Sequence, residues 1–552
     1  MKRLPDSQPW KKNAFIIAVS LFYLLGLFDL YDGVRTLLYS SAGAYCIAYF
    51  IDGSLMPWIG FLFLMGHMSI NHISRQIANA PSAVDITGAQ MVLVMKLSAF
   101  CWNVHDGRLP AEQLSPAQQY AAIREFPSVL DFAGYVLFFP SLFAGPACDY
   151  VEYKRWLETS MFDLPPGVDP SKAPVTRKKR RIPRSGRPAM WKALTGLMWI
   201  AAFLVVGPRY NTEVVLSDEY MEYNFIHRVL VLHMLGFAAR LKYYGVWMLT
   251  EGACILSGMG YNGVDPHTGK VSWDKLENVN AWNLETAQSP HAYIASWNKN
   301  TNHWLRNYVY LRVTPKGKKP GFRASLSTFV TSAVWHGFYP GYYLTFLLGA
   351  FLQTSAKRTF NLPSNSLPSI LVLTEADFRR HIRPFFLSPT DPTKPLPAKR
   401  YYDIAGWLTT QLALSFAAAP FIILRFKDCI AVWARVYFYG IIGVALSMGI
   451  FGLRPVRKYL AKQLEARNKR AIGAAGPAQA GKERKEEKME EEERRGLALG
   501  LPDDLAGDID AARREIQREI ETRRRRGSAV TMPSGQELKA AIEQKVGRKL
   551  EF

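Results

Sequence analysis

The sequence predicts an all-α, polytopic integral membrane protein with about eleven transmembrane helices. Three observations predict this fold class. Residues 1–453 contain a succession of apolar runs that are long enough, or nearly long enough, to cross a hydrocarbon core. Several connections between these runs are rich in lysine and arginine, as the cytoplasmic loops of membrane proteins are. Residues 454–552 have no sustained apolar run, so we expect a membrane domain followed by a charged tail.

The first five predicted helices are separated by turn signals. Asp52-Gly53 divides the second run from the third, and Asp106-Gly107 follows the fourth, where we interpret Asp106 as a turn residue. A basic segment precedes the first run and no small-residue cleavage site follows it, so we expect an uncleaved first span. The expected helices cover residues 14–30, 39–51, 55–70, 91–102 and 135–147.

Six further helices are expected over residues 190–206, 225–239, 244–259, 329–352, 404–423 and 430–451. The seventh and its surroundings contain several side chains that carry or can acquire a positive charge: His227, Arg228, His233 and Arg240. A helix that faced lipid on all sides would not tolerate so many of them, so they should face the bundle interior or an interface.

The charge of the chain indicates an anionic partner. Its 552 residues include 68 Lys+Arg and 46 Asp+Glu, a formal net charge of +22. The basic run at residues 177–181 would by itself suit a nuclear signal or a nucleic-acid patch. Beside membrane spans it is better interpreted as a cytoplasmic loop, so we expect the lipid bilayer and not nucleic acid as the partner. The tail should be cytosolic, and partly helical or disordered.

Metal-dependent and thiol chemistry are not indicated. The five cysteines are scattered and form no CxxC pair, which argues against a metal site and against a disulfide framework. The chain also lacks the GxxxxGK[ST] pattern of a phosphate-cradling loop. We therefore expect no metal and no permanently bound cofactor.

One side chain that titrates near neutral pH, His336, lies inside the apolar run at residues 329–352. A charged group at membrane depth costs about 2.5–3.5 kcal/mol on insertion scales, so such a residue is a candidate for function. A neutral imidazole with a free nitrogen can act as a general base. Gly337, Pro340 and Gly341 follow and should loosen the helix beside the ring. The alternative is a histidine whose nitrogen is satisfied by a helix neighbour.

A second polar segment precedes this run. Asn298, Asn302 and Arg306 recur every four residues in an aromatic-rich stretch, which would place them on one face of a helix. An asparagine amide can donate a hydrogen bond to a developing oxyanion, while a histidine takes the proton of an attacking hydroxyl. Together they suit the transfer of an acyl group inside a site that excludes water.

The residues that carry this pattern resemble a known family. Trp297-Asn298 followed by Trp335-His336-Gly337 resembles the signature of the membrane-bound O-acyltransferases. The stretch from residue 297 to residue 306, together with residues 85–91 and 102–107, resembles the lysophospholipid acyltransferases of fungi. The resemblance covers residues 14–451 and leaves out the tail.

The resemblance implies a helical bundle around an intramembrane reaction chamber in the endoplasmic reticulum. It implies transfer of a fatty acyl chain from acyl-CoA, a co-substrate, to a lysophospholipid in phospholipid remodelling or synthesis. His336 and Asn298 would be the catalytic residues. The expected substrate contacts are Trp297, Thr301, Asn302, Trp304, Arg306, Trp335, Tyr342 and Tyr343.

Acyl-CoA carries phosphates, which need cations near the site. Arg312, Lys316, Lys318, Lys319 and Arg323 lie between the asparagine segment and the histidine, and are the candidates. They would serve equally well as charges that set the topology of a loop.

Two groups of alternatives stay open. A multi-span transporter could use an intramembrane histidine as a proton relay, but it gives no role to the asparagine segment, and the chain has no evident two-fold repeat. Within the resembling family, the acceptor could be a sterol, a diacylglycerol or a protein. The lipid headgroup and the oligomeric state are not predicted.

Overall fold

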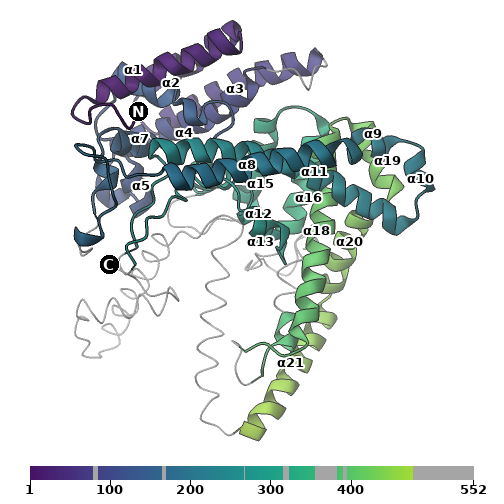
Figure 1. The fold of residues 1–552 in the computed structure, drawn as a ribbon. Helices are drawn as coiled ribbons and strands as arrows, with labels where there is room; N and C mark the ends of the chain where they lie inside the picture. The colour runs from purple at the N-terminus through teal and green to yellow at the C-terminus, as the bar shows by residue number, and fades with distance from the viewer. Residues whose placement is uncertain are drawn as a thin grey trace.

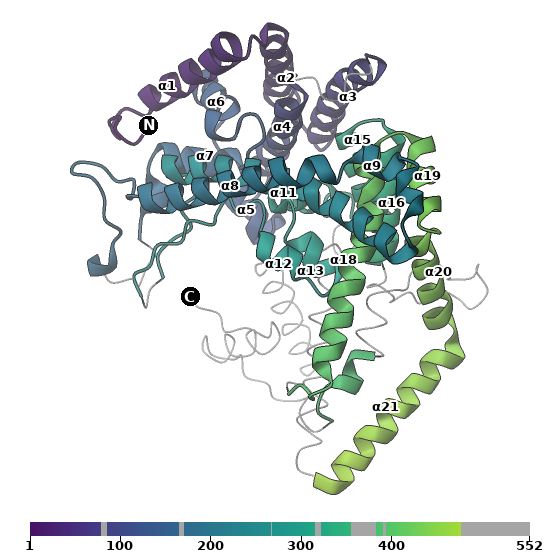
Figure 2. The same cartoon turned by 45° about the vertical axis from the view of Figure 1, so that its right-hand side comes forward.

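The computed structural model describes residues 1–78, 85–164, 170–265, 268–314, 322–354, 382–389 and 394–475. These residues form helices joined by turns and loops, and the pairing between extended segments within them is limited to three isolated bridges. Figures 1 and 2 show the helices from two sides. The all-helical fold class is therefore confirmed for the described residues.

The N-terminal part contains four long helices. They are α1 (Pro9–Leu21), which continues as a π-helical turn to Leu27, α2 (Tyr31–Phe50), α3 (Met56–Ile77) and α4 (Thr87–Gly107). α4 packs against both α2 and α3, and its residues are buried on every side. A helix that is apolar all round is expected at the centre of a bundle.

The fifth predicted span, residues 135–147, is wrong. α6 (Val129–Val136) ends almost where that span should begin, and a 3-10 turn at Phe139–Ser141 follows. Pro140 lies in this turn, and proline has no backbone N–H with which to continue a helix. The neighbouring helices α5 (Pro116–Ala121) and α7 (Tyr150–Leu157) are also short.

The seventh and eighth predicted spans are one helix. α11 (Phe225–Ser257) runs for 33 residues beside α8 (Gly186–Val206), as Figures 1 and 2 both show. The two backbones approach closely at a pair of glycines. A Cβ on Gly196 would lie 3.0 Å from the carbonyl oxygen of Gly245, so a side chain there would push the helices apart.

Two charged residues of α11 are buried within the bundle. Arg240 donates two hydrogen bonds, of 2.8 and 2.9 Å, to the carboxylate of Glu285, 45 positions away. Arg228 is also buried, so the prediction that these cations face the interior is confirmed for both. His227 is exposed and stacks on Tyr223, so it does not face the interior, and the predicted interface stays a prediction for this residue.

Five short helices flank α11 in the sequence, two between α8 and α11 and three after α11. They are α9 (Thr212–Leu216), α10 (Glu219–Glu222), α12 (Ala281–Glu285), α13 (Pro290–Ala295) and α14 (Lys299–Leu305). A π-helical turn, Arg306–Tyr310, follows α14 directly. The predicted regular helix through Arg306 is therefore wrong, because the register changes after Leu305.

The predicted span at residues 329–352 is also two helices. α15 (Phe322–His336) ends at the histidine, and α16 (Pro340–Thr354) begins after a break. Gly337 has a φ of +120°, a backbone conformation that a side chain would strain. Pro340 then occupies the first position of the new helix, where its missing N–H costs nothing.

The C-terminal part contains α18 (Lys399–Ile423), α19 (Phe426–Arg435), α20 (Tyr439–Gly452) and α21 (Arg454–Ala475). The predicted span at residues 430–451 is broken, since α19 and α20 meet at an angle of 75°. In Figures 1 and 2, α21 points away from the bundle.

Three helical segments within the described residues are long and apolar enough to span a membrane: Pro9–Leu27, Gly186–Leu216 and Lys399–Ile423. The bent pair α19 and α20 makes a fourth if it is one span. The predicted number of about eleven is not confirmed. Trp191, Leu194 and Leu197 are exposed on α8, as expected of apolar side chains on a helix that faces lipid.

The buried apolar side chains form two large cores. The first joins α1 to α7 with residues that follow Asn298, and it includes Trp335. The second joins α11 to α16, α18 and α19. The break between α15 and α16 therefore lies where the two cores meet.

Candidate active site

His336 is the last residue of α15, and aromatic rings surround its imidazole. The rings of Trp335, Tyr342, Phe346 and Phe421 lie 4.7, 5.7, 5.2 and 4.8 Å away between centroids. They come from α15, from α16 and from α18. Among the described residues, no side chain or backbone group forms a hydrogen bond with the His336 ring. The alternative of a histidine satisfied by a helix neighbour therefore finds no support in this part of the chain.

A second histidine fixes the backbone beside His336. His72 of α3 is buried, and its Nε2 lies 3.1 Å from the carbonyl oxygen of Trp335. Because a carbonyl accepts, this nitrogen must carry the proton. The His72 ring also lies against Gly337, where an added Cβ would meet it at 3.2 Å. This contact requires both the glycine and the turn that it forms.

Two tryptophans connect the histidine segment with the asparagine segment. The rings of Trp304 and Trp335 lie 6.0 Å apart. Each also bonds to α4: Trp304 Nε1 donates to Ser98 Oγ at 2.9 Å, and Trp335 Nε1 donates to the carbonyl of Met91 at 3.0 Å. The buried helix α4 therefore supports both segments, which the sequence predicts to act together.

Asn298 does not lie within a helix but caps the start of α14. Its φ of 46° and ψ of 52° are left-handed, a conformation that asparagine adopts more readily than other residues with a Cβ. Thr301 Oγ1 donates to Asn298 Oδ1 at 2.8 Å, which orients the amide. Among the described residues, the Asn298 amide nitrogen has no acceptor, so its two N–H groups are available to a ligand.

Asn302 and Trp297 fix the backbone at the start of α14. The Asn302 amide nitrogen donates to the carbonyls of Ile294 and Trp297, at 2.9 and 2.7 Å. Both of its N–H groups are therefore used within the protein. The Trp297 ring packs on α11, where the ring of Trp247 lies 4.7 Å away. These contacts indicate positioning roles for two residues that the sequence suggests as substrate contacts.

The remaining predicted substrate contacts differ in their surroundings. Thr301 and Trp304 are buried, while Arg306 is half-buried and already interacts within the protein. Tyr342 lies beside His336, whereas Tyr343 on the next position of α16 is exposed. Tyr342 is therefore the better placed of the two tyrosines.

Arg312 is paired with a buried carboxylate. Its guanidinium donates to both oxygens of Asp106, one of them at 2.8 Å, and lies 4.3 Å from the centroid of the Trp102 ring. Asp106 is 1% exposed, so its interpretation as a simple turn residue is insufficient. A phosphate contact by Arg312 would require breaking this pair.

We expect Asp106→Asn to destabilise the fold by about 3–5 kcal/mol, because it leaves the buried Arg312 without its counter-charge. Thermal or denaturant unfolding of the purified protein in detergent measures this. Asp32→Asn is the control, since Asp32 and Arg35 form an exposed pair whose loss should cost at most about 1 kcal/mol. Equal losses for the two variants would contradict the structural role of Asp106.

The other candidate phosphate ligands are mostly not described. Lys316, Lys318 and Lys319 lie outside the described residues, and Arg323, near the start of α15, is exposed. The structure thus leaves the lysines as a prediction from sequence.

Three residues of the site were not predicted from the sequence: His72, Phe346 and Phe421. His72 follows the apolar run predicted at residues 55–70, where a histidine is usually interfacial. Its partner Trp335 is 263 positions away, and nothing in the sequence connects the two. The phenylalanines are indistinguishable in the sequence from other apolar residues of their helices.

The fold and this arrangement define a class of protein, a helical membrane protein that brings a histidine and an asparagine-led helix onto one central helix. The chain belongs to the membrane-bound O-acyltransferase (MBOAT) family, whose family model matches residues 81–366. The matched range includes both Asn298 and His336. The resemblance seen in the sequence is confirmed.

Curated relatives extend this result. The chain is 43% identical over 467 residues to a lysophospholipid acyltransferase of Schizosaccharomyces pombe, covering 85% of this chain and 86% of that protein. It is 42% identical over 459 residues to a lysophospholipid acyltransferase of Saccharomyces cerevisiae, covering 82% and 71%. Lysophospholipid acyltransferase 1 of Arabidopsis thaliana is 29% identical over 412 residues, covering 73% and 80%.

Proposed function

We propose that this protein is a lysophospholipid acyltransferase that transfers a fatty acyl chain from acyl-CoA to the free hydroxyl of a lysophospholipid. The observation that carries the proposal is the 43% identity to a lysophospholipid acyltransferase over 85% of the chain. The His336 imidazole, enclosed by aromatic rings and without a hydrogen-bond partner among the described residues, supports the chemistry.

In the proposed reaction, His336 takes the proton of the lysophospholipid hydroxyl as the oxygen attacks the thioester carbonyl. A carbon–oxygen bond forms and the carbon–sulfur bond breaks. The coenzyme A thiolate leaves, and the protonated imidazole returns the proton to its sulfur. The histidine ends in its starting state, so no cofactor needs to stay bound to the protein.

Asn298 would stabilise the negative charge that develops on the carbonyl oxygen. Its amide N–H groups are not used within the described part of the protein, and Thr301 orients the amide. The rings around His336 would keep water away from the thioester. Trp335, His72 and α4 would act as positioning groups for these two residues.

The acyl-CoA phosphates would be attracted by the basic segment that contains Lys316, Lys318 and Lys319. Changing the three lysines to glutamine should raise the KM for acyl-CoA about tenfold, because a screened charge attraction contributes roughly 0.2–1 kcal/mol for each lysine. Added salt should reduce the difference between this variant and the unmodified protein, since it screens such attractions. An unchanged KM in correctly inserted protein would leave these lysines a role in topology alone.

The proposed setting is the endoplasmic reticulum membrane, with residues 454–552 on the cytosolic side. The basic segment at residues 177–181 supports a cytoplasmic face at that end of α8. A protease added to sealed microsomes should therefore remove an epitope placed at the C-terminus without detergent.

A product assay tests the proposed function. Purified protein in lipid nanodiscs is supplied with labelled acyl-CoA and a panel of lysophospholipids that differ in headgroup. We expect a labelled diacyl phospholipid. A labelled sterol ester, triacylglycerol or protein, in parallel reactions with those acceptors, would replace the proposal by another reaction of the family. The absence of any acyl transfer would favour the transporter alternative.

A further inference from the structure

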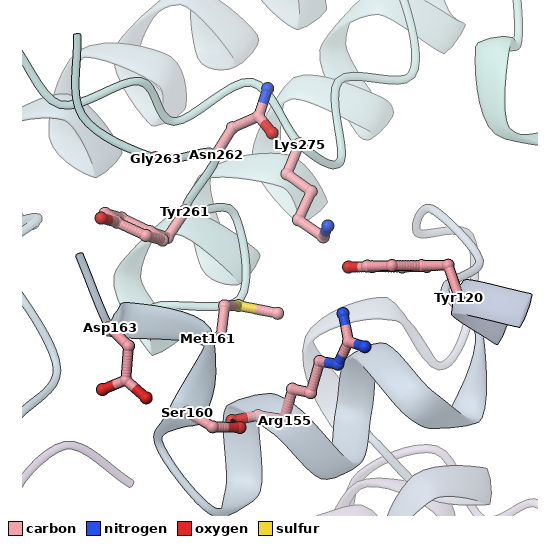
Figure 3. Close-up of a pocket in the computed structure, with 9 residues that line it drawn as sticks. All are labelled: Tyr120, Arg155, Ser160, Met161, Asp163, Tyr261, Asn262, Gly263 and Lys275. Atoms are coloured by element: carbon pink, nitrogen blue, oxygen red, sulfur yellow. Dashed lines mark hydrogen bonds between the residues drawn. The ribbon is translucent and has the colours of Figure 1, made fainter. Parts of the chain in front are cut away.

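A pocket of about 300 Å³ lies outside the candidate active site, between α5, α7 and two loops. α5 contributes Tyr120, and α7 contributes Arg155. The loops contribute Tyr261 and Lys275. Figure 3 shows the amino group of Lys275, the hydroxyl of Tyr120 and the guanidinium of Arg155 pointing toward one another. Three polar groups from three separate segments thus converge.

Arg155 has a charge that no carboxylate of the described residues balances. Its guanidinium lies 4.0 Å from the centroid of the Tyr120 ring. This contact orients the planar group and its N–H donors. Among the described residues it makes no ion pair and no side-chain hydrogen bond. The fork of an arginine held on an aromatic face, with its donors unused, is suited to bind a phosphate by two parallel hydrogen bonds.

The carboxylates near the pocket are already paired. Glu152 lies 2.9 Å from the Lys275 amino group. Asp163, which lines the pocket, is paired with Arg181. Because each acid neutralises one cation, Arg155 remains as an excess positive charge.

Lys275 should also be charged. Burial lowers its pKa, but Glu152 and Tyr120 outweigh burial and leave the pKa above its usual value. The ammonium therefore adds donors to the same end of the pocket. Figure 3 shows the Tyr261 hydroxyl turned away from this end, so that ring serves as a wall and not as a further donor.

The pocket lies at the level where membrane-spanning helices begin. Arg181, the partner of Asp163, stands just before the start of α8 at Gly186. The backbone N–H of Arg181 bonds to Asp6, just before the start of α1, and Lys2 bonds to the carbonyl of Pro183. The first ends of both spans are thus held together beside the pocket rim. The phosphates of lipid headgroups lie at the ends of membrane-spanning helices, which is the level of this pocket.

We propose that this pocket binds a phosphate group of an anionic ligand, with Arg155 as its main contact and Lys275 as the second. The phosphate has two possible sources. It belongs either to the headgroup of an anionic phospholipid in the adjacent leaflet or to a soluble nucleotide such as coenzyme A. The residues that line the pocket do not include His336 or Asn298. Binding of an anionic phospholipid there is independent of the function proposed above, whereas binding of coenzyme A rests on it.

Binding to the purified full chain in detergent, measured by thermophoresis, tests the proposal. The probes are dioctanoyl phosphatidic acid and coenzyme A, each titrated at low salt. Arg155→Gln should weaken the binding of one probe at least tenfold, and that probe identifies the source. Arg155→Lys should weaken it less, because the charge remains without the fork. The control is Arg187→Gln, the same charge change at a nearby exposed arginine, which should alter the affinity less than twofold.

Each outcome of this experiment either supports or overturns the proposed phosphate site. A loss that is confined to Arg155 variants and to one probe supports the proposal with that source, and a loss for both probes supports a general phosphate site. Unchanged affinity of both probes in a folded Arg155→Gln protein overturns it. So does an equal loss in the Arg187→Gln control, because the effect would then be one of surface charge. Should Arg155→Gln not fold, the same comparison made with Arg155→Lys decides, since that variant keeps the charge.

Discussion

His336→Ala should lose most of the acyl transfer activity, by a factor of about 10²–10⁴, while the protein still inserts and folds. The loss follows from the proposed role of the imidazole as the base that takes the hydroxyl proton. The aromatic contacts of His336 come from α15, α16 and α18, so the variant leaves a small space among rings and removes no ring hydrogen bond that is present in the described part of the chain. A residual rate is expected because orientation and the oxyanion contact remain.

Two further variants make this result specific. His336→Gln fills the same space but cannot accept a proton at neutral pH, so it should not restore activity. His227→Ala removes an exposed histidine from α11 and should keep activity within about twofold of the unmodified protein, since surface changes usually have small effects. Initial rates are divided by the amount of folded protein, measured by size-exclusion chromatography.

This normalised rate separates three interpretations of His336. A general base predicts low activity per folded molecule. A purely structural histidine predicts less folded protein but nearly normal activity per molecule, and that result would end the proposed mechanism. A transporter predicts no acyl transfer even in the unmodified protein.

The sequence predicted a candidate site because the residue types that suit its proposed chemistry are concentrated in two short segments. Trp297-Asn298 and Trp335-His336-Gly337 are each recognisable without knowledge of the fold, and the family match includes both. The apolar helices α8 and α18 were also predicted within a few residues, because long, strongly apolar runs are typical of helices that span a membrane.

The breaks in other helices could not be predicted from apolar content alone. The run around His336 is continuous in hydropathy, yet the chain turns at Gly337 because the ring of His72 occupies the space that a side chain would need. Conversely, the sequence predicted two helices over residues 225–239 and 244–259, but α11 is continuous, and Arg240 between them is buried in a pair with Glu285. In both cases the partner residue is distant in the sequence.

The proposed role of Asn298 was predicted from its amide group, but its backbone conformation was not predicted. The four-residue spacing suggested a helix face, whereas Asn298 adopts left-handed angles and precedes the helix. Asn302 keeps its place one turn later but uses its amide to hold the carbonyls of Ile294 and Trp297. A pattern of period four therefore combined one candidate catalytic residue with one positioning residue.

Asn298→Gly should lose acyl transfer by a factor of about 10²–10³, the usual effect of removing one oxyanion donor. Glycine is the informative replacement because the φ of 46° suits it, so the backbone is kept and only the amide is removed. Asn298→Ala would add strain of about 1–2 kcal/mol from its Cβ in the left-handed conformation. We therefore expect Asn298→Ala to match Asn298→Gly in activity per folded molecule but to be less stable. If Asn298→Gly is instead fully active, the backbone turn is what matters and the oxyanion role is excluded.

Two companion variants complete the argument for Asn298. Thr301→Val removes the hydroxyl that orients the amide but leaves the amide in place, so it should cost less activity than Asn298→Gly. Combining Asn298→Gly with His336→Ala should be little worse than His336→Ala alone, because residues that act as a unit in one transition state have non-additive effects. Multiplying losses, with each variant folded, would mean that the two residues stabilise separate steps. In that case Asn298 would be assigned to substrate binding, which a raised KM with an unchanged kcat in Asn298→Gly would identify.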